Sequence, residues 1–205
     1  GFPICEDVWH PDIVARLKNM GADLIIIPNG SPYESSKLAE RQATIKRRCK
    51  ESNLPIIYLN LVGGQDDLVF DGGSFVCDHD GKILCQFPQF VEKNWQVILE
   101  RRKNSLAPLP NSLAEIGSRH SQDYKAVVLG LKDYVLKSNF NKVVIGLSGG
   151  IDSALVTVMA RDALGPENVV CLALPSKFNS KASLDDARSL AKNLGINFEI
   201  ISIQE

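Results

Sequence analysis

The most informative stretch of this sequence reads Val143-Val144-Ile145-Gly146-Leu147-Ser148-Gly149-Gly150-Ile151-Asp152-Ser153. Its apolar run predicts a buried strand, its two glycines predict a tight turn, and residues 152–164 have the pattern of a helix. This order gathers free backbone N–H groups and the positive end of a helix dipole at one point, which makes an anion site. Gly149 and Gly150 let an anion approach the backbone closely. The turn lacks the spacer and the lysine of a Walker A motif.

The turn also carries polar side chains that suit a nucleotide. Ser148 and Ser153 can donate their hydroxyls, and Asp152 can hold a divalent cation through its carboxylate. The pattern Ser-Gly-Gly-x-Asp-Ser after a strand resembles the pyrophosphatase loop of the N-type ATP enzymes. Those enzymes cleave ATP between the α- and β-phosphates and adenylate an acid or a carbonyl. The resemblance implies that Asp152 holds Mg²⁺ and that ATP binds to Gly146, Leu147, Ser148, Gly149, Gly150, Ile151, Asp152 and Ser153.

Composition sets only broad limits. The 205 residues suffice for one large or two small cores, and 44% apolar with 23% charged residues is ordinary for a globular protein. The net charge of −1 gives no argument for nucleic acid or a membrane surface. Five cysteines without a C-x-x-C pair favour free thiols in a reducing compartment, which we expect to be the cytoplasm. The start at Gly1, without Met, indicates an internal start with further elements upstream.

Strands and helices alternate along the first half of the chain. The expected elements are a helix from Pro11 to near Gly21, a strand over 24–27, a helix over 36–52, a strand over 56–59, and a hairpin of strands 74–77 and 82–86. The helix over 36–52 is basic, and we interpret its arginines as a solvated face. The three histidines have no metal-ligand spacing, so we expect no zinc site.

The second half has its own alternating pattern after a change in composition. Residues 93–123 are rich in proline and polar residues and predict a connector around a short helical piece over 95–102. The expected elements that follow are a helix over 124–140, strands over 143–147 and 169–174, a helix capped by Ser183 and ended by Gly195, and a strand over 198–203. Alternation of this kind predicts a parallel doubly wound sheet.

The first half resembles the C-terminal part of a nitrilase-type amidohydrolase domain. The resemblance is carried by Cys5-Glu6-Asp7, Ser31-Pro32-Tyr33, Asn60, Gly63-Gly64-Gln65-Asp66 and Phe70-Asp71-Gly72-Gly73-Ser74. It implies that Cys5 is a nucleophile that attacks an amide or nitrile carbon, helped by a glutamate and a lysine that lie upstream of this chain. It also implies that Ser31 and Lys37 hold glutamine. Without a substrate, the two would be a turn serine and a solvated helix lysine.

Together the two halves resemble the family of glutamine-dependent NAD(+) synthetases. The resemblance implies a partial nitrilase-like α-β-β-α sandwich over 1–92, a connector over 93–123, and a partial Rossmann-like parallel sheet of the adenine nucleotide alpha hydrolase type over 124–205. It further implies a homo-oligomer that amidates deamido-NAD(+) with ATP and with ammonia from glutamine, and that binds neither nucleic acid nor a membrane. Residues 1–205 alone are expected to be inactive, because the upstream glutamate and lysine are absent.

Three functions stay open on the sequence. The first is the two-site ligase. The second is a stand-alone carbon–nitrogen hydrolase whose second half only binds nucleotide. The third is a non-catalytic remnant used for subunit assembly. The intact polar residues of the turn, above all Asp152, argue against the last two, because a decayed loop would be expected to lose them.

Overall fold

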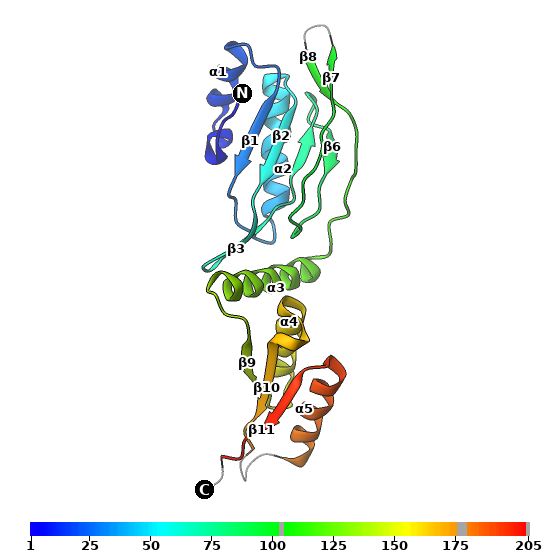
Figure 1. Ribbon diagram of the computed structural model, residues 1–205. Helices are drawn as coiled ribbons and strands as arrows, with labels where there is room; N and C mark the ends of the chain where they lie inside the picture. The colour runs from blue at the N-terminus through cyan, green and yellow to red at the C-terminus, as the bar shows by residue number, and fades with distance from the viewer. Residues whose placement is uncertain (103–104, 176–179, 204–205) are drawn as a thin grey trace. The chain divides into compact units, whose positions relative to one another are not determined.

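The computed structural model describes residues 1–102, 105–175 and 180–203 and forms two compact units (Figure 1). The first unit comprises residues 1–63 and 68–126, and the second comprises residues 64–67 and 127–205. The elements, in chain order, are the 3-10 helix η1 (Cys5–Trp9), α1 (Pro11–Asn19), β1 (Ile25–Asn29), α2 (Lys37–Ser52), β2 (Ile56–Asn60), β3 (Val62–Gln65), β4 (Leu68–Asp71), β5 (Phe75–Cys77), β6 (Ile83–Gln86), β7 (Leu99–Arg102), β8 (Ser105–Pro108), α3 (Arg119–Lys137), β9 (Val143–Gly146), α4 (Ile151–Leu164), the 3-10 helix η2 (Pro166–Asn168), β10 (Val169–Ala173), α5 (Lys181–Leu194) and β11 (Asn197–Ile200).

The first unit is built on a four-stranded sheet with the order β1-β2-β5-β6. Strands β1 and β2 are parallel, whereas β5 and β6 continue the sheet as the antiparallel hairpin that the sequence predicted. Helices α1 and α2 contact each other and cover one face of the sheet (Figure 1). Because strand side chains alternate between faces, every second residue enters the core beneath these helices. That core includes Ile25, Ile27, Ile56, Tyr58, Phe75, Ile45 and Cys49.

The opposite face of this sheet holds a smaller cluster. Val76, Cys85 and Phe87 are buried there, and the rings of Phe87 and Trp95 stack with 4.8 Å between their centroids. The short helix predicted over 95–102 is wrong, because residues 99–102 form β7 and pair antiparallel with β8. The hairpin satisfies the backbone N–H and C=O groups of this proline-rich stretch without the sustained apolar period that a packed helix requires.

The second unit contains the predicted parallel sheet, with the order β11-β10-β9. Helices α4 and α5 contact each other and lie on one face of it (Figure 1). Small residues of the two helices pack against the strands in a core that comprises Leu147, Ala160, Val169, Cys171, Ala187, Ala191 and Ile196. Strand β9 leads into α4 and strand β10 leads into α5, which is the right setting for a site at the carboxyl ends of these two strands.

Two helix starts differ from the prediction. Helix α3 begins at Arg119 rather than at 124, because the Ser118 hydroxyl accepts a hydrogen bond from the N–H of Ser121 at 3.3 Å and caps an extra turn. Helix α5 is capped by Ser180 rather than by Ser183. The Ser180 hydroxyl accepts from the N–H of Ser183 at 3.1 Å, so Ser183 already lies in the first turn.

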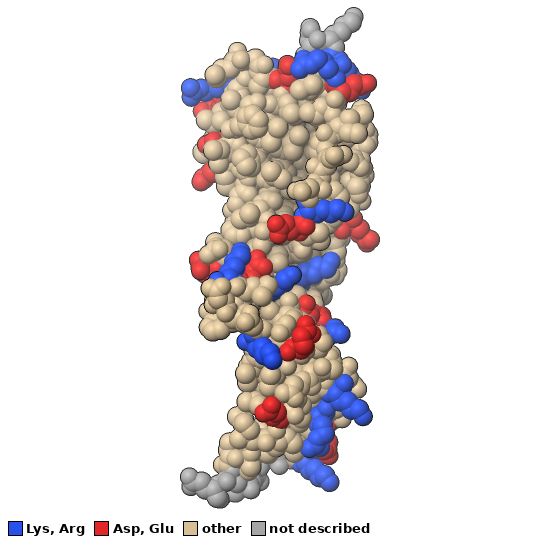
Figure 2. All heavy atoms as spheres, viewed as in Figure 1, with Lys and Arg blue, Asp and Glu red and all other residues tan. Residues whose placement is uncertain are grey.

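The surface carries both signs of charge. Lysine and arginine side chains occur together with aspartate and glutamate side chains over each unit on the face that Figure 2 shows. None of the helices in the described part of the chain has both the length and the apolar character needed to cross a bilayer.

Candidate functional site

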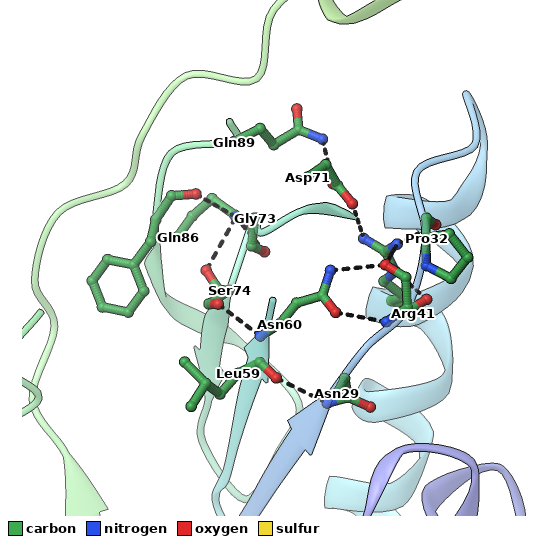
Figure 3. Close-up of polar contacts among 12 residues, drawn as sticks. Asn29, Pro32, Arg41, Leu59, Asn60, Asp71, Gly73, Ser74, Gln86 and Gln89 are labelled. Atoms are coloured by element: carbon green, nitrogen blue, oxygen red, sulfur yellow. Dashed lines mark hydrogen bonds and ion pairs between the residues drawn. The ribbon is translucent and has the colours of Figure 1, made fainter. Parts of the chain in front are cut away.

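The carboxyl ends of β1 and β2 lie side by side at one edge of the first unit's sheet. Asn29 and Asn60, the last residues of the two strands, are paired in register. The Asn60 side chain accepts a hydrogen bond from the N–H of Ser31 at 2.9 Å and donates to the Ser31 carbonyl at 3.1 Å. The Ser74 hydroxyl in turn accepts from the N–H of Asn60 at 2.9 Å (Figure 3). The loop after β1 is therefore fixed to the end of β2.

Cys5 begins η1 in an unusual backbone conformation. Its φ angle is +48°, in the left-handed region, which costs a non-glycine residue about 1–3 kcal/mol and is found most often at functional sites. Cys5 is a free cysteine and is only half-buried. Residues 1–4, which precede Cys5, form no regular strand, although the Gly1 carbonyl accepts from the N–H of Ile26 at 2.9 Å. Asp7 stabilises the turn, because its carboxylate accepts from the N–H of Ile4 at 2.9 Å.

Tyr58 of β2 is buried in the core of the first unit. Burial raises the pKa of its hydroxyl to about 12, although the positive charge of Arg41 opposes this shift. Ser31 lies in the loop after β1, and η1, which Cys5 begins, also contacts β1. The segments that carry the predicted nucleophile and the predicted binding serine are therefore both next to β1.

Arg41 forms the centre of a buried polar network around this loop (Figure 3). Its Nε donates to the Ser31 Oγ at 3.0 Å, and its Nη2 donates to the carbonyls of Ser31 and Pro32, each at 2.8 Å. Its Nη1 pairs with Asp71 Oδ1 at 2.8 Å, and Asp71 Oδ2 accepts from Gln89 at 2.8 Å. The interpretation of the basic helix as a solvated face is wrong for Arg41, which is 1% exposed.

Lys37 lies at the start of α2 and faces η1. Its Nζ is 3.4 Å from the Glu40 carboxylate and 5.5 Å from the centre of the Trp9 ring. Its side chain is 28% exposed, so it is neither free in solvent nor buried. Among the described contacts, those of Lys37 are with Glu40 and Trp9 rather than with Ser31. The structure therefore places this predicted glutamine ligand against the Cys5 turn.

The sequence of α2 does contain a signal that two of its arginines are buried, whereas Arg47 is exposed as predicted. Arg41, Ile45, Arg48, Cys49 and Ser52 recur at spacings of three and four and are all buried. A helix places such residues on one face. The position of Arg41 and Arg48 within this stripe was the signal in the sequence that marks them as buried.

The glycine-rich turn of the second unit has the predicted form. Leu147 extends the strand ladder of β9 by donating its N–H to the Leu172 carbonyl at 2.8 Å, and α4 starts at Ile151. Gly149 has φ +84°, and a Cβ there would lie 2.1 Å from the Ser183 carbonyl oxygen. Only glycine fits this position, whereas Gly150 has φ −85° and no close backbone neighbour.

The polar residues of the turn hold one another. The hydroxyls of Ser148 and Ser153 are 3.0 Å apart, and the Ser153 hydroxyl also donates to the Gly150 carbonyl at 3.0 Å. Gly150 occupies the N-cap position of α4, so no side chain caps its first N–H groups in the described structure. Asp152 lies in the first turn of α4 and is exposed. Such a helix start suits a phosphate group.

A cleft of about 200 Å³ opens beside this turn at the carboxyl ends of β9 and β10. Its walls are Gly146, Leu147 and Ser148 from the turn, Leu172, Ala173, Leu174 and Pro175 from β10 and its continuation, and Ser183 and Leu184 from α5. Three of the eight predicted ATP residues line the cleft, and the others form the turn and helix start next to it. Within the described residues, no group of three or more His, Cys, Asp or Glu side chains is arranged to hold a metal ion.

Comparisons with known proteins agree with this division. Residues 1–106 match the family model described as carbon-nitrogen hydrolase, and residues 123–205 match the model described as NAD synthase. The chain belongs to the carbon-nitrogen hydrolase family, and a segment of the NAD synthase type follows in the same chain.

The chain is homologous to glutamine-dependent NAD(+) synthetases. It is 49% identical over 204 residues to the enzyme of Rhodobacter capsulatus, and 45% identical over 204 residues to that of Xanthomonas campestris. Each match covers 100% of this chain and 37% of the relative, so the chain spans little more than a third of those proteins. The structure of the synthetase from Acinetobacter baumannii in complex with ADP matches with a TM-score of 0.91 and 38% identity, over 100% of this chain and 38% of that one.

Proposed function

We propose that the full-length protein containing this chain is a ligase that makes NAD(+) from deamido-NAD(+), ATP and ammonia released from glutamine. The observation that carries the proposal is that both family models match one chain, over residues 1–106 and 123–205. A hydrolase alone would not need the second segment. Cys5, with its strained backbone, provides a candidate nucleophile in the first segment. The turn at 148–150, which requires glycine at position 149, provides a candidate phosphate site in the second segment.

In the first site, the Cys5 sulfur attacks the amide carbon of glutamine. The amide nitrogen leaves as ammonia, and a γ-glutamyl thioester remains until water releases glutamate. Ser31 and Lys37 are the groups that we assign to the polar end of glutamine, because a hydroxyl and an ammonium suit a carboxylate. The glutamate and lysine that the family resemblance implies belong to the upstream part of the protein.

In the second site, residues 146–153 bind ATP. The open start of α4 and the Gly149 turn fit a phosphate, and the neighbouring cleft between the ends of β9 and β10 fits an uncharged ring. The Acinetobacter baumannii relative was solved in complex with ADP, which supports the binding of an adenine nucleotide by the full-length protein. Asp152 would hold Mg²⁺, which neutralises phosphate charge. The carboxylate of deamido-NAD(+) attacks the α-phosphate, pyrophosphate leaves, and ammonia then displaces AMP to form the amide.

Glutamine labelled with ¹⁵N in its amide tests this function in the full-length protein. With ATP, Mg²⁺ and deamido-NAD(+), the label should appear in the carboxamide of NAD(+), with one AMP and one pyrophosphate per product. Labelled ammonia without NAD(+) would support the hydrolase, and neither product would support a non-catalytic remnant.

We also propose the domain division into residues 1–92, 93–123 and 124–205, and a cytoplasmic homo-oligomer as the working state. The domain division and the homo-oligomer rest on the resemblance to the synthetase family, and the cytoplasmic location rests on the five cysteines without a C-x-x-C pair.

A further inference from the structure

Helix α2 carries two arginines that lie under the first site rather than on the surface. Arg41 is 1% exposed and Arg48 is 4% exposed. Their spacing of seven residues equals about two helical turns, so both point from the same face of α2. Burying a guanidinium is costly unless its donors are satisfied, and each of these arginines satisfies its donors on a different segment of the chain. The two segments are those that hold Ser31 and Cys5.

Arg41 determines how the Ser31 hydroxyl is oriented. A serine hydroxyl has one proton to donate and two lone pairs that accept. Because Arg41 Nε donates to the Ser31 Oγ at 3.0 Å, a lone pair is occupied from the side of α2. The Ser31 proton is thereby left to donate to a group other than Arg41, such as a bound substrate. The two bonds from Nη2 to the Ser31 and Pro32 carbonyls fix the backbone of the same loop.

Arg48 holds the other segment. Its Nε donates to the Val8 carbonyl at 2.9 Å, and its Nη2 donates to the Trp9 carbonyl at 3.3 Å. Its Nη1 pairs with Glu51 one turn further along α2. Val8 and Trp9 are the last residues of η1, the single short helix that Cys5 begins. Arg48 thus anchors the carboxyl end of the turn whose first residue is the strained Cys5.

We propose that Arg41 and Arg48 are positioning residues of the glutamine site, with separate tasks. Arg41 sets the loop that binds glutamine, and Arg48 sets the turn that carries the nucleophile. The inference rests on the proposed roles of Cys5 and Ser31. Neither arginine touches the substrate. Each acts through the segment it holds, so the two should affect different kinetic constants.

Lysine replacements separate the tasks, because lysine keeps the charge but lacks the planar fork that contacts several acceptors at once. In the full-length protein, Arg41→Lys should raise the KM for glutamine about tenfold or more with little change in kcat, as expected for lost hydrogen bonds to a charged group. Arg48→Lys should lower kcat about tenfold or more and leave KM within about twofold, since the nucleophile rather than the binding loop is displaced. Glutamate release at varied glutamine gives both constants.

Two controls on the same helix distinguish positioning from general destabilisation. Arg47→Lys changes an exposed arginine and should leave both constants unchanged. Ile45→Val removes one methylene from a fully buried residue of the core that also contains Val8, so it lowers the melting temperature but removes no hydrogen bond of either arginine. If Arg41→Lys and Arg48→Lys change KM and kcat in the same proportion as Ile45→Val, the arginines are structural only and the inference is overturned.

A double-mutant cycle tests whether Arg41 works through Ser31. Ser31→Ala should raise the KM to a similar degree, and adding Arg41→Lys should then have less than half of its effect in the wild type. Additive effects would overturn the proposed route. Should Arg41→Lys not fold, Asp71→Asn, which keeps an oxygen for Nη1 but removes the charge, should still raise the KM for glutamine.

Cys5→Ala distinguishes the failure of this inference from that of the proposed function. If Cys5→Ala still releases glutamate, the glutaminase assignment itself is wrong. If Cys5→Ala abolishes release while the arginine variants match their controls, the glutaminase assignment stands and only the positioning roles are lost.

Discussion

The Arg41 guanidinium and the Asp71 carboxylate, thirty positions apart in the chain, form an ion pair of 2.8 Å with 0% and 1% of their side chains exposed. Removing one partner of such a pair leaves a buried charge without compensation. Asp71→Ala should therefore destabilise the protein by about 3–5 kcal/mol. Thermal and denaturant unfolding of the full-length protein measure the change.

The matched control for this pair is Asp67→Ala, which removes an exposed carboxylate and should change the stability by less than about 0.5 kcal/mol. The double replacement Arg41→Met with Asp71→Leu should be less destabilising than Asp71→Ala, because it leaves no unpaired charge. Equal stability of Asp71→Ala and the wild type would contradict the buried ion pair.

Gly149 and Gly150 should respond differently to the same change. A Cβ at Gly149 would lie 2.1 Å from the Ser183 carbonyl oxygen on a backbone with φ +84°, so Gly149→Ala should displace α5 from the turn and abolish ATP-dependent pyrophosphate release. At Gly150 the nearest atom would be the Ser148 Oγ at 3.4 Å, so Gly150→Ala should fold normally. Circular dichroism and pyrophosphate assays distinguish the two variants.

Gly150→Val then tests whether phosphate binds at this turn, rather than whether the turn folds. Its Cβ would meet only the Ser148 Oγ, at 3.4 Å, and its branched side chain stands at the start of α4, where we place the phosphate. Folding should persist while ATP-dependent ligation falls by about a hundredfold or more, in the range found when one oxyanion-binding group is lost. Ligation at the wild-type rate in Gly150→Val would show that phosphate does not approach this turn.

Cys5→Ala should abolish the use of glutamine as nitrogen donor and leave the use of ammonium salt intact. The alanine cannot form the thioester, whereas the residues assigned to ATP lie in the other unit. NAD(+) yield with ATP and Mg²⁺ is compared for the two donors in wild type and variant. A variant that still uses glutamine would identify Cys5 as a structural thiol. Loss of both donors in a folded variant would show tight coupling between the sites.

Tyr58 should make the protein less stable at high pH. Burial raises its pKa to about 12 from an ordinary value of 10, so the folded state binds this proton more tightly than the unfolded state. The resulting contribution to stability is complete below pH 10 and is lost as the pH rises towards 12. Tyr58→Phe keeps the ring that stacks on Phe75 but removes the proton.

The stability of wild type and Tyr58→Phe, measured by denaturant unfolding at a series of pH values, should therefore decline with different slopes between pH 10 and 12. The shallower slope belongs to Tyr58→Phe. The raised pKa of the buried thiols of Cys85 and Cys171 also adds to the alkaline decline, but it does so in both proteins and cancels in the comparison. Identical slopes would contradict a buried Tyr58 proton.

Short-range patterns in the sequence were enough to predict most helices and strands, the parallel sheet and the form of the turn at 148–150. The spacing of apolar residues, the glycines and the capping residues determine local structure through interactions between residues close in the chain. Their effect on helices and strands can therefore be predicted from the sequence. The same patterns misplaced the start of α5, because Ser180 and Ser183 are both capping residues and only the fold selects one. They also predicted a helix over 95–102, where pairing between β7 and β8 prevailed.

The environment of the candidate glutamine site depended on contacts between distant residues. Arg41 meets Asp71 thirty positions away, and Arg48 meets Val8 forty positions away. A basic helix in isolation favours solvent for its arginines, and only the sheet and η1 offer the acceptors that make burial favourable. The sequence by itself therefore predicted which segments carry the two candidate sites. Tertiary structure decided which side chains hold those segments in place, because acceptors for a buried guanidinium exist only once distant strands and turns have come together.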